Sequence, residues 1–149
     1  IHMWDESFNQ ITADDDPAQA LEAYIRAKVA YSKSHPLASK IFASEMLRGA
    51  PVLSHYLKKD YRDLMRSKAH IMKSWVAQGK MDPVDPFYLM FMIWGSTQHY
   101  ADFEVQVKIA LGKPRLSAAD FDKIADNLTH IILKGCGINI RDTLLIPST

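Results

Sequence analysis

The stretch that decides the fold lies at residues 86–103 and reads PFYLMFMIWGSTQHYADF. Asp85 and Pro86 form the N-cap and first-turn proline pair that typically begins an α-helix. Eight consecutive apolar residues follow the proline, so the helix is apolar on every side. Such a helix must be covered on every side, by its own chain or by a second subunit. We predict a long helix from Pro86 to about Leu111, ended by Gly112.

Prolines and glycines divide the remaining chain into further segments with helical periodicity. No stretch shows the sustained alternation of apolar and polar residues that is typical of a strand. We therefore predict an all-α bundle of five to six helices with short connections. The predicted helices cover residues 17–34, 37–48, 51–79, 86–111 and 118–135, preceded by the end of an earlier helix within residues 1–11. Residues 138–149 are expected to form an extended or irregular tail.

Composition limits the classes of protein that the chain can represent. Its 149 residues fit one domain, and its longest apolar run is far shorter than the roughly 20 residues that cross a bilayer. The N-terminal segment lacks the basic start of a signal peptide, and the single cysteine, Cys136, cannot form an internal disulfide. We expect a cytoplasmic protein. A net charge of +1 argues against a chain that binds nucleic acid phosphates unaided.

Charge is distributed unevenly, because residues 58–80 hold seven lysines and arginines but only two aspartates. We interpret this run as the solvated face of a long helix. The alternative is a face directed towards DNA or towards a DNA-binding domain.

A line of polar and aromatic side chains follows the apolar run. Trp94, Gln98 and Asp102 are spaced four residues apart, so they lie on one face of the predicted helix. An indole can stack, an amide offers one acceptor and two donors, and a carboxylate accepts hydrogen bonds. Together they suit a small planar molecule with alternating C=O and N–H groups. Spacing alone favours the alternative, a polar network that ties helices together. His99 points to another face, where a structural role is favoured.

Motifs for catalysis and for metal binding are absent from the sequence. There is no P-loop, no G-x-S-x-G, no G-x-G-x-x-G and no H-E-x-x-H, and the six histidines form no cluster with metal-ligand spacing. We therefore expect neither an enzyme nor a cofactor. Glu45, in the predicted second helix, is either a buried acid or a residue with a surface or capping role.

Two helices offer more apolar surface than a chain of this size needs for its own core. Gly95 and Ser96 would let a second backbone approach residues 86–111, and residues 117–135 carry an apolar stripe. Paired with their copies, the two helices would form a four-helix interface about a twofold axis. The alternative is that both helices lie within the core of the monomer.

Residues 37–51 and, more specifically, residues 79–86 with 91–103 resemble the C-terminal domain of TetR-family transcriptional regulators. The likeness extends from about Trp4 to Gly135, and it is close to the pyrimidine-responsive repressors of the family. It implies an effector-binding domain that dimerises through its last two long helices. DNA would be bound by an N-terminal helix-turn-helix domain that is absent from residues 1–137. Uracil or thymine is the implied ligand.

The resemblance also implies a ligand site, formed by Trp4, Trp94, Gln98 and Asp102, with His99 as a further candidate. Two alternatives stay open at this point. The domain could sense a different, more hydrophobic molecule, in which case Gln98 and Asp102 would bond to the protein itself. It could instead be a helical interaction module, which a dry core without a cavity would favour.

Overall fold

The computed structural model describes residues 2–138, with side chains from residue 6 onward, and every regular element in that part of the chain is helical. The prediction of an all-α fold is therefore confirmed. Of the predicted tail, only residue 138 lies within the described part; the description of residue 4 is limited to its backbone. The elements are α1 (His2–Asn9), α2 (Pro17–Ser34), α3 (Pro36–Leu47), α4 (Ser54–Tyr56), the π-helical η1 (Leu57–Tyr61), α5 (Arg62–Ala77), α6 (Pro86–Asp102), α7 (Glu104–Leu111) and α8 (Ala118–Gly135).

Three helix starts are capped by side chains, and the cap at Asp85 is the one predicted above. The Asp16 carboxylate accepts a hydrogen bond from the backbone N–H of Gln19, and Asp85 caps α6 in the same way. Ser117 and Asp120 form a reciprocal capping box at the start of α8. Each start depends on residues within one turn of the chain, which is why sequence patterns located it.

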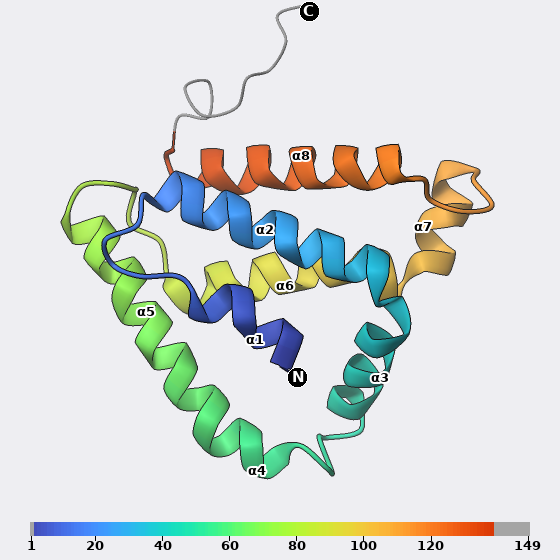
Figure 1. Ribbon diagram of the computed structural model, residues 1–149, viewed down its shortest axis with the longest axis horizontal. Helices are drawn as coiled ribbons and strands as arrows, with labels where there is room; N and C mark the ends of the chain where they lie inside the picture. Colours follow the sequence, from blue (N-terminus) through green and yellow to red (C-terminus); the bar gives the residue numbers. More distant parts are fainter. Residues whose placement is uncertain (1, 139–149) are drawn as a thin grey trace, which may run out of the picture.

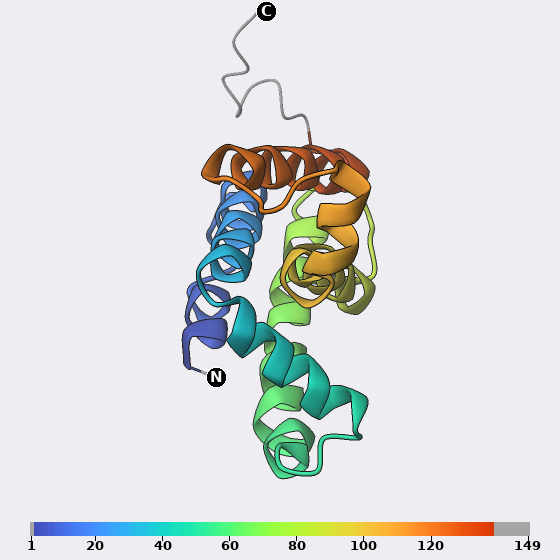
Figure 2. The same ribbon diagram turned by 90° about the vertical axis from the view of Figure 1, so that its right-hand side faces the viewer.

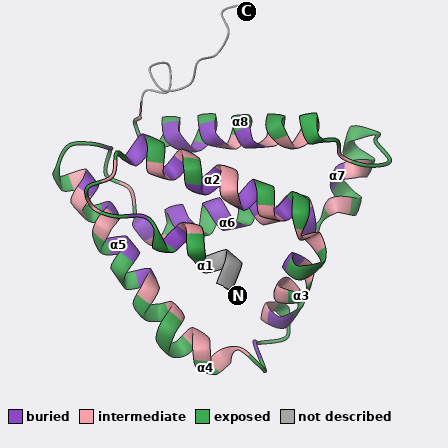
Figure 3. Cartoon of the chain, in the orientation of Figure 1, coloured by how far each residue is buried: buried purple, intermediate pink, exposed green. Residues whose placement is uncertain are grey.

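Helix α2 is central to the packing of the fold. It packs against α6 on one side and α8 on the other, while α3 packs against α6 (Figure 1). Figure 2 shows α3 and the α4–α5 segment extending away from the layer that α2, α6 and α8 form. Purple segments in Figure 3 mark the buried faces, which point inwards from these helices. The largest fully buried side chains among the described residues are those of Trp75, Tyr24 and Phe8.

The predicted helix 86–111 is interrupted, so this part of the prediction is wrong. Phe103 adopts φ −116° and ψ 32°, which ends α6 and starts α7 in a new direction. Both flanking residues are held by α3: Ser39 donates to Asp102, and Lys40 forms an ion pair with Glu104. These partners lie more than 60 residues away in sequence, so local periodicity could not indicate the break.

The predicted helix 51–79 is not one continuous α-helix in the structure. Residues 51–53 form a turn, and the helical run that follows contains the π-helical η1 before α5. A π-helical turn accommodates an extra residue, shifts the register of side chains, and occurs frequently at functional sites. Within residues 2–138, no helix is both long enough and apolar enough to span a membrane.

Candidate functional site

A cavity of about 1050 Å³ lies between α3, the α4–η1–α5 segment and α6. α3 and α5 diverge from α6 and are joined by residues 48–53 and α4 at their far ends (Figure 1). Most of the lining is apolar or aromatic. It consists of Tyr31, Ala38, Ser39, Ile41, Phe42, Glu45, Met46, Arg48, Val52, Leu53, Tyr56, Leu57, Lys58, Tyr61, Arg62, Met65, Phe87, Phe91, Trp94 and Gln98.

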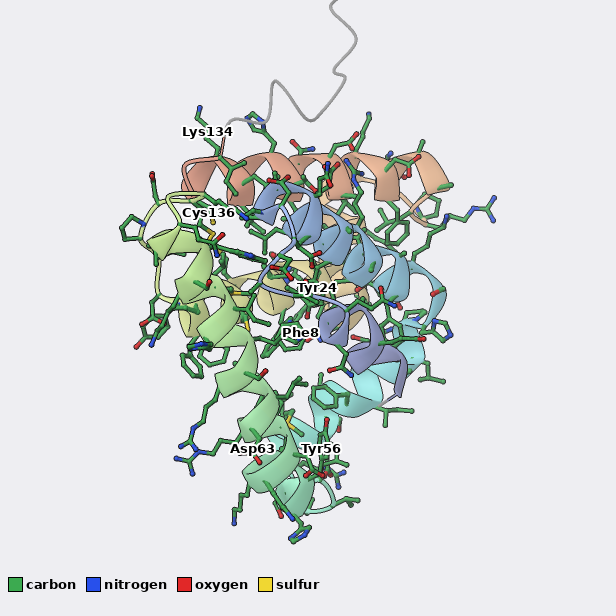
Figure 4. All side chains as sticks on the ribbon, turned by 60° about the vertical axis from the view of Figure 1, so that its left-hand side comes forward. Phe8, Tyr24, Tyr56, Asp63, Lys134 and Cys136 are labelled. Atoms are coloured by element: carbon green, nitrogen blue, oxygen red, sulfur yellow. The ribbon has the colours of Figure 1, made fainter. Side chains whose placement is uncertain are left out.

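Trp94 forms part of the cavity wall and is firmly oriented. Its indole N–H donates to the hydroxyl of Tyr24 on α2 at 2.5 Å. The rings of Phe8, Tyr61 and Phe91 each lie 6.0 Å from its ring, centroid to centroid. Phe8 and Tyr24 come together from α1 and α2 (Figure 4), and their ring centroids are 5.3 Å apart. With only 8% of its surface exposed, Trp94 is a pre-oriented part of the cavity wall.

Gln98 lines the same cavity one helical turn beyond Trp94 and is half-buried. Asp102, a further turn along, lies outside the lining. Its carboxylate accepts a hydrogen bond of 2.6 Å from the hydroxyl of Ser39, which does line the cavity. The structure thus brings Trp94 and Gln98 together at the cavity, with Asp102 behind Ser39.

The remaining predicted site residues are His99 and Trp4. His99 stacks on Phe103 with ring centroids 5.2 Å apart and does not line the cavity. Trp4 falls in α1, and its side chain lies outside the described residues.

Glu45 combines the two roles that the sequence left open, because it is buried and also caps backbone groups. One of its carboxylate oxygens accepts hydrogen bonds from the backbone N–H groups of Val52 and Leu53, at 2.7 and 2.8 Å. The other oxygen is 3.4 Å from the guanidinium of Arg48. Ala50, the loop residue between these groups, has φ 56°, a left-handed conformation that is costly for a side chain other than glycine. Glu45 therefore holds the loop that closes one end of the cavity.

The aromatic lining residues outside α6 were missed by sequence reasoning. Tyr31, Phe42, Tyr56 and Tyr61 come from four different elements, so no periodicity in one segment groups them. Tyr61 ends η1, and burial raises the pKa of its hydroxyl. A neutral phenol is therefore favoured in the wall of the cavity.

Comparison with known proteins assigns the family. Residues 1–139 match a TetR-type family model described as "YcdC-like protein, C-terminal region". The chain belongs to this family. It is also 38% identical over 135 residues to proteins named HTH-type transcriptional regulator RutR, from Escherichia coli K12, Escherichia coli O157:H7 and Shigella flexneri. The match covers 91% of this chain and 64% of each relative, so the chain spans less than two thirds of their length.

This TetR-type C-terminal region is thus related to proteins named as transcriptional regulators. Within it, Lys68 joins the cavity-lining segment to α1. Its buried ammonium group donates to the backbone carbonyls of Asn9 and Ile11, at 3.1 and 2.8 Å, and lies 5.8 Å from the ring of Phe8. Burial lowers the pKa of this lysine, although the charge of Asp15 opposes the shift. Lys68 follows Met65 of the cavity wall by three residues, so the wall and the end of α1 are mechanically connected.

Proposed function

We propose that residues 1–137 are the effector-sensing and dimerising domain of a cytoplasmic TetR-type transcriptional regulator. A small molecule would occupy the cavity, and DNA would be bound through an N-terminal helix-turn-helix domain outside this chain. The observation that carries the proposal is the cavity of about 1050 Å³, into which α6 presents a fixed indole and an amide. A helical interaction module with a dry core would have no need of such a space.

Uracil and thymine are the first effectors to test. Trp94 supplies a flat surface for stacking, and the Gln98 amide can pair with adjacent C=O and N–H groups on a pyrimidine ring. The resemblance of residues 79–103 to the pyrimidine-responsive repressors supports the same ligands. Asp102 would act through the Ser39 hydroxyl, which its hydrogen bond orients, instead of contacting the ligand.

The size of the cavity favours a second candidate, a larger and more hydrophobic effector. Pockets for drug-sized ligands typically measure about 300–1,000 Å³, and this cavity is at the upper end of that range. A single pyrimidine ring would leave much of the aromatic lining without contacts. The bond between Asp102 and Ser39 also fits this alternative, because the carboxylate already has a protein partner.

Titration calorimetry with uracil and thymine tests the pyrimidine version. We expect saturable heat with the unmodified chain, and weaker binding after Gln98→Ala. Gln106→Ala on α7 is the matched control, because Gln106 is exposed and lies outside the cavity lining. If millimolar uracil and thymine give no heat of binding, both are excluded as effectors, and the larger effector remains the candidate.

We further propose that α6 and α8 form the dimer interface. α6 exposes Tyr88, Phe91 and Met92, and α8 exposes Ile131, although all four are large hydrophobic residues. α6 and α8 also contact each other within the chain, so their exposed residues can belong to one interface. Sedimentation velocity should show a dimer that Met92→Asp weakens. A monomer at high protein concentration would reject the dimer.

A further inference from the structure

The mouth of the cavity carries more positive than negative charge. Among the residues that the structure describes, three cationic side chains line the cavity, those of Arg48, Lys58 and Arg62, and the one carboxylate in this lining is that of Glu45. The Glu45 carboxylate is already occupied by two backbone N–H groups and by Arg48. It therefore does not neutralise the other two cations.

Lys58 and Arg62 have no ion-pair partner among the side chains that the structure describes. The ion pairs found there join other residues, including Lys40 with Glu104 and Arg26 with Asp126. Lys58 and Arg62 are exposed, as expected at the mouth of a cavity, while the aromatic residues Phe42, Tyr61 and Trp94 form the wall. Cations beside a poorly polarisable wall attract anions more strongly than cations on an open surface.

The basic run of residues 58–80 is thus divided among different environments, since Lys68 is buried and the other cations are exposed. Lys58 and Arg62 line the cavity, whereas Lys59, Arg66 and Lys73 are exposed elsewhere on the same helical segment. A uniformly solvated helix face does not explain the position of Lys58 and Arg62, because both line a cavity whose other residues are mostly apolar.

From this placement we infer that the effector is an aromatic or heteroaromatic carboxylate. Its ring would lie against Trp94 and its carboxylate between Lys58 and Arg62.

This inference rests on the proposed function, because it specifies the chemistry of the effector in the same cavity. It replaces neutral uracil and thymine by a pyrimidine carboxylate, whose ring would meet Gln98, and it specifies the larger effector as an aromatic acid, which would fill more of the lining. In either case the acidic group distinguishes the ligand from its neutral analogue.

Calorimetry with two matched pairs of probes tests the inference: 2-naphthoate against 2-naphthamide, and orotate (the 6-carboxylate of uracil) against uracil. At low salt we expect the acid of at least one pair to bind about fivefold or more tightly than its neutral analogue, since two partly exposed ion pairs contribute modestly. The preference should shrink as salt screens the charges. The double variant Lys58→Gln/Arg62→Gln should abolish it.

The control variant Lys59→Gln/Arg66→Gln removes the same charge outside the cavity and should keep the preference. Helical circular dichroism verifies that both variants are folded. Neutral probes that bind as tightly as the acids would overturn the inference and leave the proposed function standing. A preference that survives in the Lys58/Arg62 variant would overturn it as well. If none of the four probes binds, the inference and the effector-binding role of this cavity both fail.

Discussion

Replacing Glu45 tests how the loop at the end of the cavity is held. Both backbone N–H groups, of Val52 and Leu53, donate to the same carboxylate oxygen. In Glu45→Gln, the amide oxygen can still accept both hydrogen bonds, and only the negative charge is lost. Hydrogen bonds to a charged group contribute about 1.5–3 kcal/mol each, against about 0.5–1.5 kcal/mol for neutral ones. At the lower bounds each bond loses about 1 kcal/mol, so we expect Glu45→Gln to lower the free energy of unfolding by about 2 kcal/mol.

Glu45→Ala removes both hydrogen bonds and should cost about 3 kcal/mol, the lower bound for two charge-assisted bonds. For a chain of this size, that corresponds to a fall in Tm of about 6–12 °C. Urea unfolding measured by circular dichroism is the assay. The control is Glu22→Gln, which removes a partly exposed i,i+4 ion pair with Arg26 and should cost about 0.3–0.5 kcal/mol. A Glu45→Ala variant as stable as the control would refute the view that this carboxylate holds the loop.

Three further predictions follow from other contacts. Lys68→Met keeps the volume of the side chain but removes two hydrogen bonds to carbonyls, so the free energy of urea unfolding should fall by about 2–3 kcal/mol; an unchanged midpoint would contradict this. Burial and the charge of Asp82 raise the pKa of Cys136 to about 11, so Ellman's reagent at pH 8 should react with unfolded protein only; fast reaction of the native chain would contradict it. Lys113 and the Ser117 cap lower the pKa of Asp120 to about 2, so its contribution to stability is present above the ordinary value of 3.8 and is lost as the pH falls towards 2. Asp120→Asn should therefore flatten the dependence of Tm on pH in that range, and an unaltered profile would argue against the contribution.

Features that depend on nearby residues were predictable from the sequence. The starts of α2, α6 and α8 follow from capping residues within one turn, and the four-residue spacing placed Trp94 and Gln98 on one face. The periodicity also extended to Asp102, but it could not show that Ser39 on α3 would occupy this carboxylate.

What depends on distant partners could not be predicted in this way. The break at Phe103 follows from two contacts with α3, and the aromatic wall assembles from helices that are far apart in sequence. The basic run at residues 58–80 was interpreted as one solvated face, because spacing alone does not reveal that Lys58 and Arg62 border a cavity. The π-helical turn at η1, which shifts the register there, has no marker in the sequence that we could identify.

The most direct test of effector binding uses the indole N–H signals of ¹⁵N-labelled protein, with Trp94→Phe to assign the signal of Trp94. Trp75 provides an internal reference, because it is fully buried and lies outside the cavity lining. Addition of uracil or 2-naphthoate should move the Trp94 signal in a saturable manner and leave that of Trp75 in place. If the Trp94 signal stays fixed at millimolar concentrations of both compounds, binding of such effectors against this indole is contradicted.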